Sequence, residues 1–179
     1  MGRRSNFARV PKDKYMTWDP RPVVALQPHL PDNVRYVEPC AGKGDLIESM
    51  RWHGHQCVYA CDTHPGRKWI EKRDALELDR RWRRSSRAQM FITNPPWTRE
   101  ILHQLIEHLP QLFPTWMLID ASWAHTGQAR PYLDQCMHIV SAGRVRWIKG
   151  TANDGVDDSA WYLFDASHAG GPRFTGLGC

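Results

Sequence analysis

Glycines, prolines and clusters of charged residues divide the chain into short apolar runs and longer amphipathic segments. Short apolar runs are typical of buried strands, whereas apolar residues that recur every three or four positions are typical of helices. The pattern predicts strands at residues 34–37, 57–61, 90–93, 116–119, about 137–148 and 159–164, with one more that ends near residues 74–76. It predicts helices at residues 21–30, 46–52 and 99–109, and another in the arginine-rich segment after residue 76.

The order of these elements predicts an α/β fold. The strand at residues 34–37, a glycine-containing turn and the helix at residues 46–52 form the first unit of a nucleotide-binding crossover fold. Asp62 follows the next strand, and Asp74 lies where a third strand would end. Because such folds bind their ligands at the carboxyl ends of the strands, we expect both side chains at the ligand-binding edge.

One domain accounts for the length and composition. The chain has 179 residues, of which 41% are hydrophobic, enough for one sizeable core. We expect a flexible basic arm at residues 1–14, the domain at residues 15–165 and a loose, glycine-rich tail at residues 166–179. No apolar run approaches the ~20 residues of a membrane helix, and the basic start lacks the apolar segment of a secretory signal. The cysteines lack the spacing of a disulfide framework, which favours a reducing, cytoplasmic location; they are Cys40, Cys57, Cys61, Cys136 and Cys179.

Positive charge is concentrated in the amino-terminal arm and in residues 67–87, and the formal net charge is +5. Such a balance permits a polyanionic partner. Arginine presents a planar fork of donors that matches phosphate. We therefore predict that nucleic-acid phosphates are contacted by Arg80, Arg81, Arg83, Arg84 and Arg87. Acidic residues between these positions leave a second interpretation open, a solvated helix face; they include Glu71, Asp74, Glu77 and Asp79.

The apolar run at residues 90–92 stops at the sequence Asn94-Pro95-Pro96-Trp97. Prolines remove backbone donors and fix φ, so the strand must end there and a stiff turn presents Asn94 and Trp97. The Asn94 side-chain oxygen and the Pro95 carbonyl are two acceptors that can bind the two N–H groups of an amino nitrogen and free its lone pair. The Trp97 indole offers a face for base stacking, an effect of roughly 1–3 kcal/mol. A simple proline turn is the alternative interpretation.

Residues 38–44, Glu38-Pro39-Cys40-Ala41-Gly42-Lys43-Gly44, form a glycine turn whose small residues allow a ligand to approach the backbone closely. Neither serine nor threonine follows Lys43, and the pattern Gly-x-x-x-x-Gly-Lys is absent. This argues against a triphosphate-binding loop. The order of the glycine turn, Asp62, Asp74 and the Asn94 tetrad is more specific than any of these features alone.

With these segments in this order, the chain resembles the class I S-adenosylmethionine-dependent methyltransferases, in particular the branch that methylates adenine N6 in nucleic acids. The similarity spans roughly residues 15–164 and rests on Tyr15-x-Thr17, the glycine turn, Asp62, Asp74 and the Asn94 tetrad. It implies a Rossmann-like, seven-stranded, mostly parallel sheet with an antiparallel last strand. The motif order resembles the gamma arrangement of DNA adenine methyltransferases, although Trp18 stands where a proline often follows the threonine.

The resemblance also implies a role for each matching residue. S-adenosylmethionine would be bound by Tyr15, Thr17, Glu38, Cys40, Ala41, Gly42, Gly44, Asp62 and Asp74, the last two contacting its ribose and adenine. The target base would be held by the catalytic residues Asn94, Pro95, Pro96 and Trp97. We expect single- or double-stranded DNA as the partner, with flipping of a paired adenine costing a few kcal/mol. No segment resembles a target-recognition domain, as in small phage and prophage enzymes, so we expect little or short sequence preference.

Three further groups of residues have simpler interpretations than a functional one. His53, His55, Cys57, Cys61 and His64 approach zinc-ligand spacing, but both cysteines fall in a predicted buried strand, where thiols pack as small apolar groups. We therefore expect no metal. Asp120, Ser122 and His125 lack a nucleophile elbow and are interpreted as part of a loop at residues 120–125, on the pocket rim. Trp161 is either a core residue or an aromatic wall of the target pocket.

Two other functions remain compatible with these features. The same fold can methylate structured RNA or a protein glutamine, because an amide nitrogen makes similar demands on its acceptors. A non-catalytic nucleic-acid-binding protein can also keep this fold. Trp97 and the arginine-rich segment favour a nucleic-acid base, and the intact tetrad favours catalysis.

Overall fold

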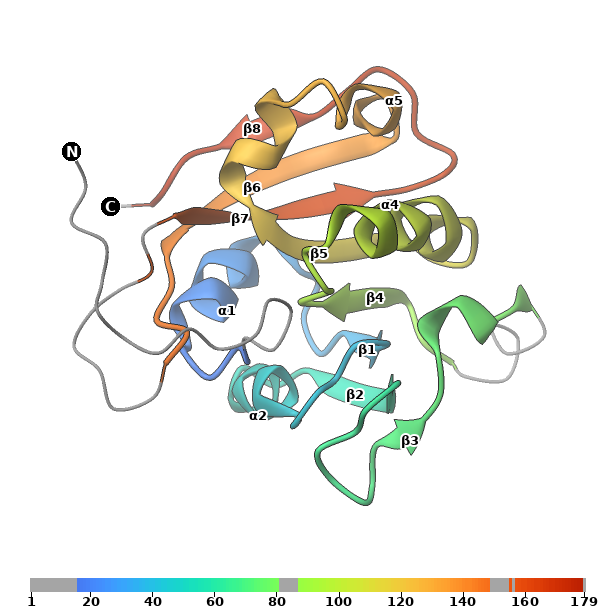
Figure 1. The fold of residues 1–179 in the computed structure, drawn as a ribbon. Helices are drawn as coiled ribbons and strands as arrows, with labels where there is room; N and C mark the ends of the chain where they lie inside the picture. Colours follow the sequence, from blue (N-terminus) through green and yellow to red (C-terminus); the bar gives the residue numbers. More distant parts are fainter. Residues whose placement is uncertain (1–15, 81–86, 149–154, 156, 179) are drawn as a thin grey trace.

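The structure is a computed structural model that describes residues 16–80, 87–148, 155 and 157–178. Its centre is an eight-stranded sheet with the strand order β3-β2-β1-β4-β5-β7-β6-β8 (Figure 1). The strands are β1 (Arg35–Glu38), β2 (Gln56–Asp62), β3 (Glu71–Lys72), β4 (Met90–Thr93), β5 (Thr115–Asp120), β6 (Cys136–Arg144), β7 (Asp158–Phe164) and β8 (Arg173–Thr175). Only β7 among the described strands is antiparallel to its neighbours, β5 and β6.

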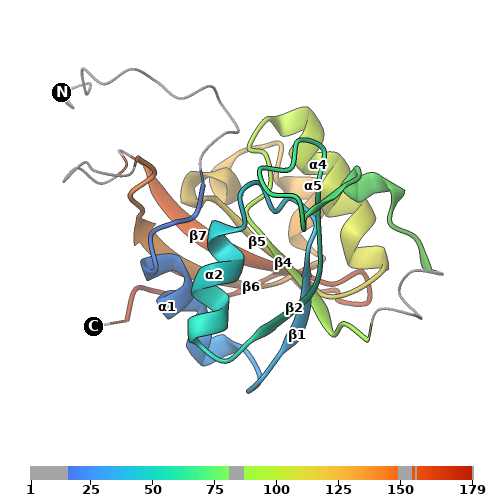
Figure 2. The same cartoon turned by 90° about the horizontal axis from the view of Figure 1, so that it is seen from below.

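Helices cover both faces of the sheet (Figure 2). The α-helices are α1 (Arg21–Leu26), α2 (Asp45–Trp52), α4 (Arg99–His108) and α5 (Arg130–Leu133), and the 3₁₀ helices are η1 (Gln27–His29), η2 (Ala75–Glu77), η3 (Leu109–Gln111) and η4 (Ala121–His125). Helices α1 and α2 pack on one face, and α4 and α5 pack on the other.

Alternating side chains of the central strands supply the two cores. In β5, Trp116 and Leu118 pack with residues of α1 and α2, whereas Met117 and Ile119 pack with residues of α4. All four are almost completely buried. A strand whose successive side chains point to opposite faces must be apolar at every position when both faces are covered. This explains why the central strands appear in the sequence as continuous apolar runs.

The chain reverses its direction of winding between β1 and β4. Strands β2 and β3 extend the sheet on one side of β1, and β5, β7, β6 and β8 extend it on the far side of β4. The carboxyl ends of β1 and β4 therefore flank a topological switch point, where open α/β sheets bind ligands.

Most predicted elements are present, with four differences. The strand expected to end near residues 74–76 is only the two-residue β3, and residues 75–77 form the 3₁₀ helix η2, which the Asp74 side chain caps. The last predicted strand but one ends at Arg144 rather than near residue 148, and residues 121–125 form the 3₁₀ helix η4 instead of an irregular loop. The tail that the sequence suggested to be loose contains β8, which pairs with β6 and makes the sheet eight-stranded. The antiparallel strand, β7, is therefore followed by one more strand and is not the last, although the sequence predicted that it would be. The helix predicted in the arginine-rich segment lies largely outside the described residues, as does the arm at residues 1–14.

In the part of the chain that the structure describes, no helix is long and apolar enough to cross a membrane.

Candidate active site

The predicted tetrad begins where β4 ends, beside the end of β1. Strand β4 pairs in parallel with β1, so Glu38, the last residue of β1, and Asn94, the first after β4, lie at the same edge of the sheet. The backbone N–H of Asn94 donates a hydrogen bond to the Glu38 carboxyl group. This contact places the tetrad directly beside the start of the glycine turn.

Two side chains fix the orientation of the Asn94 amide. Its Nδ2 atom donates to Thr17 Oγ1 at 3.0 Å, and its Oδ1 atom accepts from Trp97 Nε1 at 3.2 Å. An indole N–H can only donate, so the atom of Asn94 that faces it must be the oxygen. Trp97 Nε1 also donates to the Leu118 carbonyl at 3.0 Å, which ties the tetrad to β5.

A second tryptophan, which the sequence did not single out, packs against the tetrad. Trp147 meets Trp97 in an edge-to-face arrangement, with ring centroids 5.5 Å apart and planes at 87°. Both indoles are half-buried. Trp147 follows β6 on a segment that is held in place by Asp19, because the Arg146 backbone N–H donates to Asp19 Oδ2 at 2.8 Å. The sequence around Trp147 does not mark it as a site residue, because its contact with Trp97 depends on residues 19 and 146, which are far apart in the chain, coming together in the fold.

Trp161, the aromatic residue considered for the target pocket, belongs instead to the core. It is completely buried on β7, and its Nε1 donates to the Pro22 carbonyl at 2.7 Å. The core interpretation is therefore correct for Trp161, and the pocket interpretation is wrong. Trp147 occupies the position beside the tetrad that was considered for Trp161.

Glu38 carries a buried carboxyl group that is only partly satisfied. Its exposed fraction is 2%, and among the described residues its Oε2 atom has no hydrogen-bond partner. Burial raises the pKa of this carboxyl well above its ordinary value, and the nearby Asp62 carboxylate raises it further. A buried, unpartnered carboxyl oxygen fits a ligand that brings a hydrogen-bond donor or a positive charge.

The glycine turn approaches its surroundings too closely for side chains. Gly42 has φ +51° and Gly44 has φ +78°, values that favour glycine. A Cβ on Gly42 would lie 2.7 Å from Met16 Sδ, and one on Gly44 would lie 2.9 Å from the Trp69 ring. Asp62 supports the turn from the end of β2, since its Oδ2 accepts from the Gly42 N–H at 2.7 Å.

Further acceptors at the same edge fit the hydroxyl and amine donors of a nucleoside. Asp62 Oδ1 accepts from the His64 N–H at 2.7 Å, so each Asp62 oxygen keeps capacity for another donor. Asp74 is exposed, and its Oδ1 caps η2 by accepting from the Leu76 N–H at 2.9 Å. Cys40 is half-buried in the turn, and burial raises the pKa of its thiol, which is therefore neutral. The residues present fit a cofactor with an ammonium group and a ribose.

The structure does not gather all the predicted site residues. Tyr15, Arg81, Arg83 and Arg84 lie outside the described residues. Arg80 is exposed after η2. Arg87 precedes β4, and its carbonyl accepts from Arg35 Nε, at the start of β1. Because β1 and β4 are parallel, Arg87 lies at the amino edge of the sheet, opposite the edge that carries Asn94.

The residues considered for other chemistry have structural partners. Val34 N–H donates to His55 Nδ1 at 3.1 Å, and His55 Nε2 lies 2.8 Å from Gln27 Oε1. In the described part of the chain, no group of three or more His, Cys, Asp or Glu side chains is arranged to hold a metal ion. Asp120 Oδ1 accepts from the Ser122 N–H at 2.8 Å, and its other oxygen lies 3.9 Å from Arg99.

Comparison with known proteins supports the fold. No protein-family model matches the chain, and no curated protein sequence matches it significantly. The solved structures that are similar in fold include the following three. A protein from Lactococcus lactis assigned as a hemolysin has a TM-score of 0.60 and 13% identity, covering 92% of this chain and 94% of that one. A protein from Listeria monocytogenes assigned as a class I S-adenosylmethionine-dependent methyltransferase has a TM-score of 0.54 and 13% identity, covering 87% and 63%.

The third structure is the M protein of the type I restriction enzyme EcoKI, with a TM-score of 0.50 and 12% identity. The match covers 89% of this chain but 49% of the M protein, so the chain spans about half its length. At these identities the likeness concerns the fold and not the reaction. The chain has the Rossmann-like α/β fold of the class I methyltransferases.

Proposed function

We propose that this chain transfers the methyl group of S-adenosylmethionine to the N6 amino group of adenine in DNA. The observation that carries the proposal is the orientation of Asn94 at the switch point, where Thr17 and Trp97 direct its oxygen and the carboxyl group of Glu38 lies beside it. The methyltransferase fold and the family resemblance support the cofactor.

The Asn94 corner suits an amino nitrogen that is conjugated with a ring. Its side-chain oxygen and the Pro95 carbonyl accept the two N–H bonds and favour the geometry in which the nitrogen lone pair leaves the ring system. When bound, S-adenosylmethionine supplies a methyl group on a sulfonium, and the new N–C bond forms as the C–S bond breaks, with the electron pair left on sulfur and one proton released from nitrogen. The residues of the chain contribute alignment of the nitrogen with the methyl carbon.

A planar base is the acceptor favoured by the surroundings of Asn94. Trp97 donates to the Asn94 amide and Trp147 packs against Trp97, so two half-buried indoles lie at this corner, and bases stack on rings of this kind. A protein glutamine side chain has no ring that would use this surface. The net charge of +5 is also compatible with a polyanionic partner.

Glu38 and Asp62 are the residues that would hold the cofactor. The unpartnered Oε2 of Glu38 would accept a hydrogen bond from the ammonium of its methionine part, and Asp62 would accept hydrogen bonds from the ribose hydroxyls.

The test is methyl transfer from labelled S-adenosylmethionine to DNA, RNA or protein, followed by digestion of labelled DNA to nucleosides. We expect label in N6-methyladenine. Asn94→Ala should abolish transfer and leave cofactor affinity nearly unchanged, whereas Gln104→Ala, which removes an exposed amide on α4, should have no effect. Label found in RNA, in glutamine or in N4-methylcytosine would show that the acceptor is not adenine N6 of DNA. Full activity of Asn94→Ala would exclude the proposed role of that residue.

A further inference from the structure

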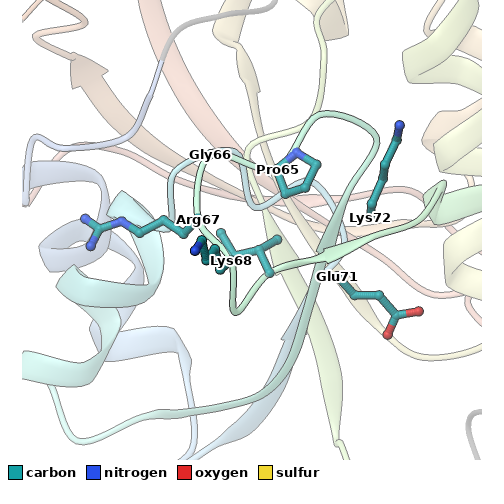
Figure 3. A pocket seen from close by; sticks show the side chains of 7 residues that line it. Pro65, Gly66, Arg67, Lys68, Glu71 and Lys72 are labelled. Carbon is teal, nitrogen blue, oxygen red and sulfur yellow. The ribbon is translucent and has the colours of Figure 1, made fainter.

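The connection between β2 and β3 forms an open groove beside the glycine turn. Parallel neighbours are usually joined by a crossover of a dozen or more residues that contains a helix. Here residues 63–70 join them without a helix, so this edge of the sheet remains uncovered. The groove has a volume of about 470 Å³ and is lined by Pro65, Gly66, Arg67, Lys68, Ile70, Glu71 and Lys72 (Figure 3).

Hydrogen bonds to two backbone carbonyls of the glycine turn hold the groove against it. The Gly66 N–H donates to the Gly42 carbonyl at 2.7 Å, and Arg67 Nε donates to the Lys43 carbonyl at 3.0 Å. A Cβ on Gly66 would lie 2.6 Å from Lys43 Cγ, so the Lys43 side chain runs along the connection. A ligand in the groove would therefore lie next to the residues proposed to hold the cofactor.

Lysines provide the free positive charge of this surface. The arginine of the connection and the one that follows β3 are both in ion pairs, since Arg67 lies 2.9 Å from Glu48 and Arg73 lies 3.1 Å from Glu71. Among the described residues, no ion pair involves Lys43, Lys68 or Lys72, and all three are exposed. Figure 3 shows Lys68 and Lys72 as separate lining residues of the same groove.

An exposed indole, that of Trp69, follows Lys68 directly in the chain. Trp69 is 52% exposed, and its ring rests on Gly44. A tryptophan that is held against backbone but leaves half its surface in water offers a rigid stacking face. Unpaired cations next to such a face are the combination by which proteins bind a single nucleic-acid strand, with phosphates on the cations and a base on the aromatic ring. An acidic peptide would use the lysines but not the indole face.

We infer that this groove binds the nucleic-acid strand adjacent to the target nucleotide, with phosphates at Lys68 and Lys72 and an unpaired base on Trp69. The position next to the target rests on the proposed function; binding of a strand does not. This surface lies at the carboxyl edge of the sheet with Asn94, unlike Arg87, which lies at the amino edge.

The charge contribution is tested by the salt dependence of binding to a labelled single-stranded oligonucleotide. The slope of log affinity against log salt should become shallower by about 0.7 for each lysine lost in Lys68→Gln/Lys72→Gln. The matched control is Arg51→Gln/Arg130→Gln, which removes the same charge from exposed positions on α2 and α5 and should leave the slope unchanged. Equal slopes in both double variants would overturn the inference.

The stacking contribution is tested at Trp69. Trp69→Leu keeps an apolar contact with Gly44 but has no aromatic face, and it should weaken oligonucleotide binding roughly tenfold. Trp69→Phe should retain most of the affinity, and unchanged affinity in Trp69→Leu would overturn the role of the ring.

Oligonucleotide binding by Asn94→Ala separates the proposed groove from the proposed methyl transfer. Normal binding without transfer supports both, whereas unchanged binding and transfer in the groove variants would reject the groove alone.

Discussion

Asn94 Nδ2 donates a hydrogen bond to Thr17 Oγ1 at 3.0 Å, although 77 positions separate the two residues in the chain. Thr17 is 3% exposed, so this contact is shielded from water. It joins the first described segment to the tetrad and leaves the Asn94 oxygen facing Trp97. In the proposed reaction, Thr17 is therefore a positioning residue for Asn94 in addition to its implied position beside the cofactor.

Thr17→Val tests this positioning role, because valine keeps the shape of threonine and removes the hydroxyl. We expect methyl transfer to fall about 10- to 100-fold, since small errors in alignment have effects of this size. The free energy of unfolding should fall by about 1 kcal/mol through the lost hydrogen bond. Single-turnover transfer and cofactor affinity are measured together.

Thr17→Ser is the matched control, since it restores the acceptor for Asn94 and should recover most of the rate. A rate loss in Thr17→Val that is fully explained by weaker cofactor binding would contradict the positioning role.

The Glu38→Gln variant tests two effects of this carboxyl group, one on cofactor affinity and one on the pH dependence of the free energy of unfolding. The ammonium of a bound cofactor would favour the ionised form of Glu38, and a neutral amide cannot supply that charge. Cofactor binding should therefore weaken about tenfold or more, because hydrogen bonds to charged groups contribute about 1.5–3 kcal/mol. The pKa of Glu38 is raised in the folded protein, so the native state holds its proton to higher pH than the unfolded state. The wild-type free energy of unfolding should therefore fall as pH rises above the ordinary carboxyl pKa, and this component should be absent in the variant. Denaturant titrations at several pH values measure it, with Glu100→Gln, on exposed α4 surface, as control.

The sequence predicted the fold well because both faces of the central strands are buried, which makes them unmistakable apolar runs. Asn94 was predictable for a related reason, since two prolines must end β4 at a ligand-binding edge. Trp147 and β8 could not be predicted in this way. Trp147 reaches Trp97 through a contact between Asp19 and the Arg146 backbone. Strand β8 is a short, largely exposed edge strand without an apolar pattern, and its pairing with β6 is supported by contacts of Arg173 and Thr175 with His138.

Acid should destabilise the fold through His138. Burial, followed by the charges of the Arg173 guanidinium and of His29, lowers the pKa of this histidine to about 4. Its ring nitrogens lie 2.8 Å from Thr175 Oγ1 and 3.2 Å from Arg173, and the rings of His29 and Trp116 pack on it. Between the ordinary histidine pKa of about 6.5 and pH 4, the unfolded state binds a proton that the folded state rejects.

The free energy of unfolding should consequently decrease as pH falls from about 6.5 to 4, by roughly 3 kcal/mol from this residue. In His138→Gln the decrease should be smaller by that amount, while His125→Gln, at an exposed position on η4, should retain it. Thermal unfolding across this pH range measures the effect, and an unchanged slope in His138→Gln would show that other groups cause the acid sensitivity.

Trp147→Ala should weaken the acceptor side of the site. The edge-to-face contact with Trp97 contributes about 0.5–1.5 kcal/mol beyond buried area, and its loss frees the Trp97 ring to move. We expect the KM for DNA to rise about 5- to 10-fold with cofactor affinity unchanged, and Trp147→Phe to recover much of the loss because it restores an aromatic edge. Trp52→Ala is the control, since Trp52 is 90% exposed at the end of α2 that points away from Asn94. Steady-state methylation at varied DNA concentration measures these constants. Equal KM values for Trp147→Ala and Trp52→Ala would mean that Trp97 binds its base without support from Trp147.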